Sequence, residues 1–259
     1  MSEPLLTFQQ LSLQIGQKII LDHLSFSLDE GKILVIAGKS GSGKSTLLKA
    51  AGGLLPENIQ TMSGHITWNG QRLYQKASWQ PLRRGGISFI FQDALSSFCP
   101  VVRVDEQLWQ ACRAAGLCRG EFERLLRDRA KSLDLSPASL HLYPQELSGG
   151  MIQRAELLFP LLLPPRLVLA DEPTSAVDSL TQQKIAQALL RLRRYHHTAI
   201  LLVTHDLRLA AALADSLLIL KDGTRQEYGP AQQVLSQPQS AYTQKLLRRS
   251  GLKGGNTCS

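Results

Sequence analysis

The stretch Ile33-Leu34-Val35-Ile36-Ala37, followed by Gly38-Lys39-Ser40-Gly41-Ser42-Gly43-Lys44-Ser45-Thr46, decides the fold class of this chain. Five consecutive apolar residues are typical of a strand that is buried on both faces, as in a parallel sheet. The glycine-rich segment matches the pattern G-x-x-x-x-G-K-[ST], and residues 46–51 have a helical composition. A strand, a glycine-rich loop and a helix in this order predict a loop that binds phosphate groups.

The residue types in this loop suit that chemistry. Glycines let the backbone curl so that its N–H groups point at one phosphate. The helix that follows begins with unpaired N–H groups and a positive dipole end, which favours an anion. Lys44 can bridge the β- and γ-phosphates of a nucleotide, and the Ser45 hydroxyl can bind Mg²⁺. We therefore expect nucleotide contacts from the whole loop, comprising Gly38, Lys39, Ser40, Gly41, Ser42, Gly43, Lys44, Ser45 and Thr46.

Two carboxylates end a second apolar run. Residues 167–170 are Leu-Val-Leu-Ala, and Asp171 and Glu172 follow directly. Asp171 at the end of a strand can hold Mg²⁺, and Glu172 can orient or deprotonate an attacking water. Carboxylates here could also merely cap the next helix. Together with the phosphate loop, the pair favours a catalytic and metal-binding role.

Two further polar residues follow strand-like runs. His205 comes after Leu201-Leu202-Val203-Thr204, and Gln92 comes after Ile87-Ser88-Phe89-Ile90-Phe91. In open parallel sheets, ligands bind at the carboxyl ends of the strands. Each residue alone is a weak signal, since a histidine there is usually packed and hydrogen-bonded. Together they favour one ligand site at that edge.

Bulk properties are those of an ordinary globular chain. It has 259 residues, of which 43% are hydrophobic and 19% charged, enough to bury a sizeable core. The net charge of +8 favours anionic partners, but the basic residues are spread out without an aromatic-rich patch, so we expect no nucleic-acid binding. The spacing of Cys99, Cys112, Cys118 and Cys258 matches no metal-binding pattern, and we expect reduced thiols.

The order of the expected elements indicates one α/β domain. Alternating apolar residues near the start, from Leu11 to Leu28, predict antiparallel strands. Later strands alternate with helices, which suggests a parallel sheet covered by helices. A helical stretch over 93–158 interrupts that alternation. We expect residues 1–92 and 159–228 to form an ATP-binding core that includes the antiparallel strands. Residues 93–158 should form a helical subdomain, and residues 229–259 a C-terminal extension.

The segment Leu147-Ser148-Gly149-Gly150-Met151-Ile152-Gln153-Arg154 resembles the signature motif of the ATPase subunits of ABC transporters. A serine and two glycines at a helix start can cap the helix and offer N–H groups to a γ-phosphate. The resemblance covers about residues 6–247. It implies a P-loop NTPase of the ABC ATPase type, with a RecA-like core, an N-terminal antiparallel β-subdomain and an inserted helical signature subdomain.

The resemblance also assigns roles to the site residues. It implies ATP and Mg²⁺ as cofactors, with the metal near Ser45, Gln92 and Asp171. Gln92 matches a glutamine that reports to the membrane subunits, and residues 175–178 match a loop that crosses to a second subunit. The catalytic residues it implies are Glu172, His205 and Gln92, and the nucleotide contacts beyond the loop are Ser148, Gly149, Gly150 and Asp178.

Partners follow from the same resemblance. It implies a second ATPase subunit, identical or a sister chain, two membrane permease subunits and, indirectly, an extracytoplasmic solute-binding protein. The first residues do not have the pattern of a secretory signal. The most apolar stretch, residues 157–170, is too short for a membrane-spanning helix, which needs about 20 apolar residues, and three prolines interrupt it. We expect a peripheral protein on the cytoplasmic face of the inner membrane.

Several segments resemble one branch, the nickel, peptide and metallophore importers. They include Pro81–Gly85, Phe91–Pro100, Leu142–Leu147 and the tail Pro238–Leu247. The short length is most similar to nickel-transport subunits, so we expect uptake of nickel, free or chelated. Di- or oligopeptide import is the alternative, and an exporter or non-transport ATPase a further one. Relatives often place an aromatic residue for adenine near Ile15, where this chain is aliphatic.

Overall fold

The computed structural model describes residues 3–73, 76–83, 85–175 and 177–252. Ala176 of the 175–178 loop, Arg84 of the branch-like segment, Cys258 and the end of the C-terminal extension lie outside these ranges. The larger sheet of the described chain has the strand order β10-β9-β3-β8-β7-β6. Its strands are β3 (Ile33–Ala37), β6 (Ile87–Ile90), β7 (Leu167–Asp171), β8 (Ala199–Val203), β9 (Ser216–Lys221) and β10 (Thr224–Pro230).

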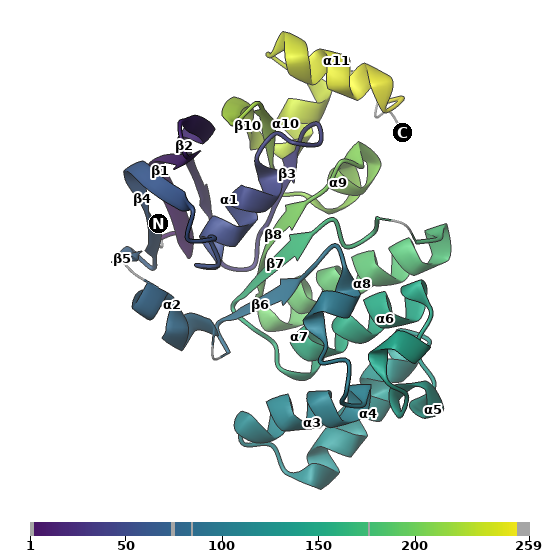
Figure 1. Cartoon of the computed structure of the whole chain (residues 1–259). Helices are drawn as coiled ribbons and strands as arrows, with labels where there is room; N and C mark the ends of the chain where they lie inside the picture. The colour runs from purple at the N-terminus through teal and green to yellow at the C-terminus, as the bar shows by residue number, and fades with distance from the viewer. Residues whose placement is uncertain (1–2, 74–75, 84, 176, 253–259) are drawn as a thin grey trace.

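Five of these strands run parallel. β3 pairs with β8 and β9, and β7 pairs with β8 and β6, all in parallel register, while β10 is antiparallel to β9. The carboxyl ends of β3, β6, β7 and β8 therefore meet at one edge of the sheet (Figure 1). All five residues of β3 and of β8 are buried, which explains their uninterrupted apolar runs. The expected α/β fold class is confirmed.

A smaller antiparallel sheet contains the N-terminal strands. Its order is β2-β1-β4-β5, with β1 (Leu6–Ile15), β2 (Lys18–Leu28), β4 (Ile59–Trp68) and β5 (Gln71–Leu73). The expected antiparallel pairing is confirmed, but register shifts after Phe8 interrupt the simple alternation. β4 extends from Ile59 to Trp68 because it pairs with β1 along its length. Ile15 and Ile19 beside the hairpin turn are 36% and 57% exposed.

The two faces of the larger sheet belong to separate apolar cores. Leu34 and Ile36 of β3 pack with α1 (Lys44–Ala51) and the smaller sheet. Ile33 and Val35, which alternate with them, pack on the opposite face with α8 (Ser179–His196) and α9 (Leu207–Leu213). Because other elements pack on both faces of the larger sheet, the edge at the carboxyl ends of its strands is held in place, and the polar residues meet at that edge.

The helical region follows β6 and returns to β7. It contains η1 (Ala94–Ser97), α3 (Val104–Ala114), α4 (Arg119–Ser132), α5 (Pro137–Leu140), η2 (Pro144–Glu146), α6 (Gly149–Glu156) and α7 (Leu158–Leu162). Within the helical stretch expected over 93–158, Gly116, which has a φ of 92°, follows the end of α3 and separates it from α4. These helices form the lower part of the molecule in Figure 1.

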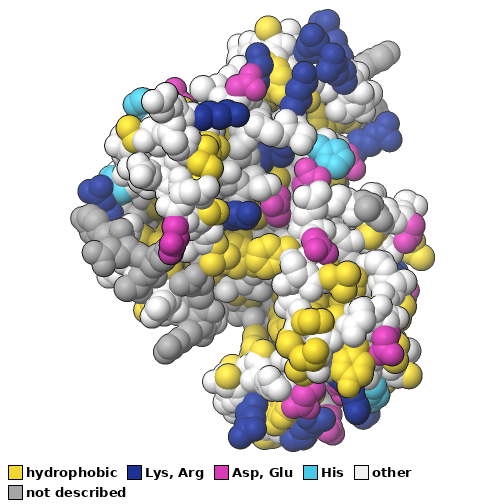
Figure 2. Space-filling view, in the orientation of Figure 1, with side chains coloured by type: hydrophobic (Ala, Val, Ile, Leu, Met, Phe, Trp, Pro, Cys, Tyr) yellow, Lys and Arg dark blue, Asp and Glu magenta, His cyan; other side chains and the backbone are white. Residues whose placement is uncertain are grey.

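The remaining helices are α2 (Lys76–Arg83), α10 (Ala231–Ser236) and α11 (Ala241–Arg249). Lys and Arg side chains gather over α11 at the top of the molecule, among them the exposed Lys245, Arg248 and Arg249 (Figure 2). Among the described residues, no helix combines the length and the apolar character that crossing a membrane requires.

Candidate nucleotide site

Tight packing shapes the glycine-rich loop. A Cβ on Gly38 would lie 2.1 Å from the carbonyl oxygen of Leu220 in β9, so only glycine fits between the two strands. Gly43 has a φ of 95° and is the N-cap of α1, where no side chain caps the helix. The first turn of α1 therefore keeps its N–H groups available for an anion.

Lys44 lies on the inner side of this loop. Its side chain is buried, and its Nζ donates to the carbonyl oxygens of Gly38, at 3.0 Å, and Lys39, at 2.9 Å. Burial lowers the pKa of Lys44, an effect that the negative charges of Glu172 and Asp171 partly oppose. The loop thus holds a cationic donor opposite the acidic end of β7, as contact with a triphosphate requires.

Asp171 and Ser45 bring two oxygens together. The Ser45 hydroxyl donates to Asp171 Oδ1 at 3.1 Å, which joins the start of α1 to the end of β7. Burial raises the pKa of Asp171, and the Ser45 hydrogen bond and nearby lysines oppose the rise. A hydroxyl and a half-buried carboxylate suit Mg²⁺, which prefers one or two protein oxygens beside phosphate oxygens.

Glu172 and His205 form the next pair along this edge. Glu172 has a φ of 45°, unusual for a residue with a side chain, and its N–H donates to Val203 of β8 at 2.9 Å. That turn aims the carboxylate at the loop after β8, where Glu172 Oε2 lies 2.9 Å from His205 Nδ1. The imidazole is mostly exposed and the carboxylate mostly covered. Backbone strain at such a position is a frequent feature of functional sites.

Gln92 is exposed and lies two residues beyond the end of β6. Within the described part of the chain, its side chain makes no hydrogen bond to Ser45 or Asp171. The parallel sheet places Gln92 at the same edge as the phosphate loop, and Asp93 beside it caps η1 by accepting from Leu95 N–H at 3.2 Å.

The signature residues begin α6. Ser148 is the N-cap, and its hydroxyl accepts from Met151 N–H at 3.3 Å, so the predicted cap is confirmed. Ser148 and Gly149 are exposed, and a Cβ on Gly149 would meet open space. The N–H groups at this end of α6 therefore face outward.

Asp178 caps α8 in the loop that follows Glu172. Its carboxylate accepts from Thr181 N–H at 2.9 Å and from the Thr181 hydroxyl at 2.8 Å, which lowers the pKa of Asp178. Arg154 of α6 donates to the same hydroxyl at 2.9 Å, and Gln153 reaches the Ser175 carbonyl at 3.5 Å. The signature helix thus contacts the loop that carries Asp178.

Two residues beside these elements were not predicted. Glu156 of α6 accepts from Phe91 N–H at 2.9 Å; a lone acid within an otherwise apolar run of residues 155–163 is a signal that could have found it. Tyr242 of α11 accepts from Lys39 N–H at 3.3 Å, and its ring centroid lies 5.5 Å from Lys221 Nζ. Nothing local in the sequence indicates that the C-terminal helix touches the phosphate loop.

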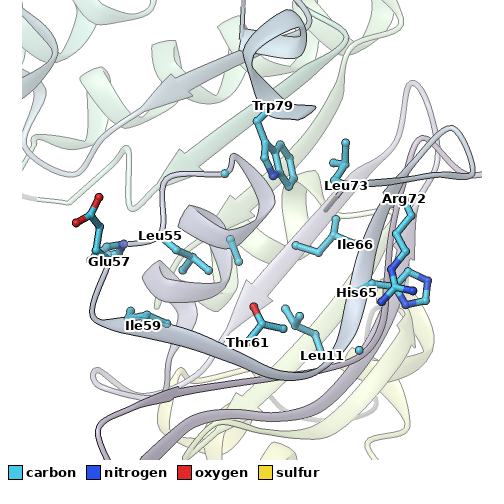
Figure 3. A pocket seen from close by; sticks show the side chains of 14 residues that line it. Leu11, Leu55, Glu57, Ile59, Thr61, His65, Ile66, Arg72, Leu73 and Trp79 are labelled. Atoms are coloured by element: carbon cyan, nitrogen blue, oxygen red, sulfur yellow. The ribbon is translucent and has the colours of Figure 1, made fainter. Parts of the chain in front are cut away.

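A separate hollow lies between β4, the end of α1 and α2. Its volume is about 540 Å³, and Leu11, Thr61, Ile66 and Trp79 line it (Figure 3). None of the sequence-predicted site residues lines this hollow. The candidate nucleotide site is therefore the sheet edge and not this hollow.

The strand, loop and helix around Lys44, with an acidic strand end beside it, define a P-loop nucleoside triphosphatase. The family model described as "ABC transporter" matches residues 21–175. The chain belongs to the ABC transporter ATP-binding family and is an ATPase of that type.

Three comparisons illustrate the likeness. The oligopeptide transport ATP-binding protein OppD of Salmonella typhimurium is 38% identical over 238 residues, which cover 90% of this chain and 70% of OppD. The metal-staphylopine import ATP-binding protein CntD of Staphylococcus aureus is 32% identical over 251 residues, which cover 94% of this chain and 92% of CntD. A bacterial ABC transporter cassette solved as a dimer is 26% identical, with a TM-score of 0.77, and covers 87% of this chain and 98% of that one. The same cassette was also solved with ADP and Pi.

Proposed function

We propose that this chain is the ATP-hydrolysing motor of an importer for di- or oligopeptides. The observation that carries ATP hydrolysis is the meeting of Lys44, the Ser45–Asp171 pair and the Glu172–His205 pair at one sheet edge. The relatives of this chain are mainly oligopeptide and dipeptide transport proteins, which supports the peptide class.

The geometry supports a division of labour within the site. The loop around Lys44 holds the phosphates, and Ser45, Asp171 and Gln92 would hold Mg²⁺, which screens the phosphate charge when bound. Glu172 takes the proton of the attacking water, since its carboxylate lies at the strand end beside the loop. His205 orients Glu172 through the 2.9 Å contact. The γ-phosphate contact that the family resemblance implies for His205 would come from the same imidazole.

Partners extend this proposal. The exposed Ser148 and Gly149 suit a phosphate held by a second ATPase chain, and the known dimeric cassette supports such an assembly. The chain would work beneath two permease subunits on the cytoplasmic face of the membrane, fed by a solute-binding protein. An exporter or a non-transport ATPase has less support, because OppD is named as a transport protein and CntD as part of an import system.

A second candidate is uptake of a metal chelate. The metal-staphylopine relative matches over 92% of its own length, whereas OppD matches over 70%. This observation favours chelated metal over free nickel. Nickel, which we expected from the sequence, now has less support than peptides.

An uptake experiment tests both candidates. Cells carry the native operon with either the wild-type chain or Glu172→Gln, and take up a labelled tripeptide, labelled nickel, or nickel with a chelator. Glu30→Gln is the control, because Glu30 pairs with Arg166 at the exposed surface. Loss of tripeptide uptake alone supports the proposal. Loss of chelated-nickel uptake alone replaces it with the second candidate, and unchanged uptake of all three contradicts both.

A further inference from the structure

Glu156 is a buried carboxyl group that the proposed mechanism does not use. It is the last residue of α6 and is 1% exposed. Its Oε1 accepts the Phe91 N–H at 2.9 Å and also the Ser97 hydroxyl. Its Oε2 is buried and has no hydrogen-bond partner among the described residues.

The two donors lie on either side of Gln92. Phe91 directly precedes it, one residue beyond the end of β6, and Ser97 ends η1. One carboxylate oxygen therefore fastens both ends of the 91–97 segment to α6. Ser148, at the other end of α6, lies eight residues away, or about 12 Å along a helix. Rigid secondary-structure elements can carry coupling between two sites, and α6 connects the contacts of Glu156 with Ser148 at its other end.

We propose that Glu156 is a positioning residue that couples the Gln92 segment to the signature helix, so that the two ATP sites of a dimer respond to each other. This inference rests on the proposed function, in which Gln92 serves the site in its own chain and Ser148 serves the site of the second chain. Glu156 would then be the hydrogen-bonded junction between these two sites.

The chemistry of the position supports a role other than packing. The surrounding core is apolar, and burial raises the pKa of Glu156 to about 7, with a further rise from the charge of Asp93. Hydrogen bonds from Phe91 and Ser97 oppose that rise only in part. An apolar residue of similar volume would suit a purely structural position better.

The test uses the transporter complex, purified through a tag on this chain and assayed for ATP hydrolysis over a range of ATP concentrations. Glu156→Met keeps the volume but removes the acceptor, whereas Glu156→Gln keeps an acceptor oxygen. We expect Glu156→Met to lower kcat about tenfold with KM for ATP within about twofold, and to lower the Hill coefficient to one. Glu156→Gln should restore most of kcat and cooperativity.

Two further variants keep the inference falsifiable. Ser97→Ala removes one donor without disturbing the core and should lower kcat by about twofold to fivefold. Glu123→Met, in the exposed ion pair with Arg119 on α4, should leave kcat unchanged. If the wild-type complex hydrolyses ATP cooperatively and both Glu156→Met and Ser97→Ala keep that cooperativity, the coupling role is overturned but the proposed function is not. A wild-type complex without ATPase activity overturns the proposed function, and the inference with it.

Discussion

The Nδ1 of His205 lies 2.9 Å from Oε2 of Glu172, across the carboxyl ends of two neighbouring parallel strands. Glu172→Gln keeps the shape of this pair but removes the base. We expect ATP hydrolysis to fall by about 100-fold or more, because general-base catalysis contributes that order of rate. ATP binding and dimer closure need no activated water and should persist.

Phosphate release and size-exclusion chromatography with ATP check this prediction. The variant should elute as an ATP-dependent dimer under conditions in which the wild-type chain turns over. Glu30→Gln, on the surface and paired with Arg166, is the matched carboxylate control. Rapid turnover by Glu172→Gln would exclude Glu172 as the base.

Lys44 provides a test of nucleotide binding itself. Lys44→Ala removes the cation that the loop carbonyls of Gly38 and Lys39 hold in place. A hydrogen bond to a charged phosphate is worth about 1.5–3 kcal/mol, so ATP affinity should fall by about tenfold to a hundredfold. Isothermal titration calorimetry measures the change, with the exposed Lys131→Ala on α4 as control. Equal affinity in both variants would contradict the phosphate-loop assignment.

Two glycines of the loop should respond differently to alanine. The added methyl group of Gly38→Ala would lie 2.1 Å from Leu220 oxygen, so β9 or the loop must shift. We expect a loss of about 3 kcal/mol in unfolding free energy and weaker ATP binding. At Gly41, with a φ of 77° and open space, alanine should cost only the backbone strain of about 1–2 kcal/mol. Urea unfolding compares the two, and a larger loss at Gly41 would contradict the packing argument.

Local patterns predicted the strand, loop and helix around Lys44, because each depends on residues adjacent in the sequence. The edge position of Asp171, Glu172 and His205 followed as well, because parallel strands end on the same side of a sheet. The contacts of Glu156 with Phe91 and of Tyr242 with Lys39 could not be predicted. They join residues 65 and 203 positions apart, and only the packing of the helical region and of α11 creates them.

Glu156 predicts a pH dependence of stability. Its pKa is raised from an ordinary value of 4.5 to about 7 in the folded chain, mainly by burial. The folded state therefore binds the proton more tightly than the unfolded state does. Below pH 4.5 both states are protonated and the group has no effect. As pH rises from 4.5 to about 7, folded stability declines by a contribution of about 3 kcal/mol, and above pH 7 that contribution is constant.

Glu156→Gln removes this titration and keeps the acceptor for Phe91 N–H, so it isolates the charge. The free energy of unfolding of Glu156→Gln minus that of wild type should increase from pH 4.5 to pH 7 and then stay constant. Chemical denaturation at pH 5, 6, 7 and 8 measures the difference, with the exposed Glu123→Gln as a control that should show little slope. A constant difference between Glu156→Gln and wild type across this range would mean that the carboxyl ionises in the folded chain as readily as in water. The buried environment of Oε2 argues against that outcome, because no hydrogen-bond donor in the described chain stabilises a charge there.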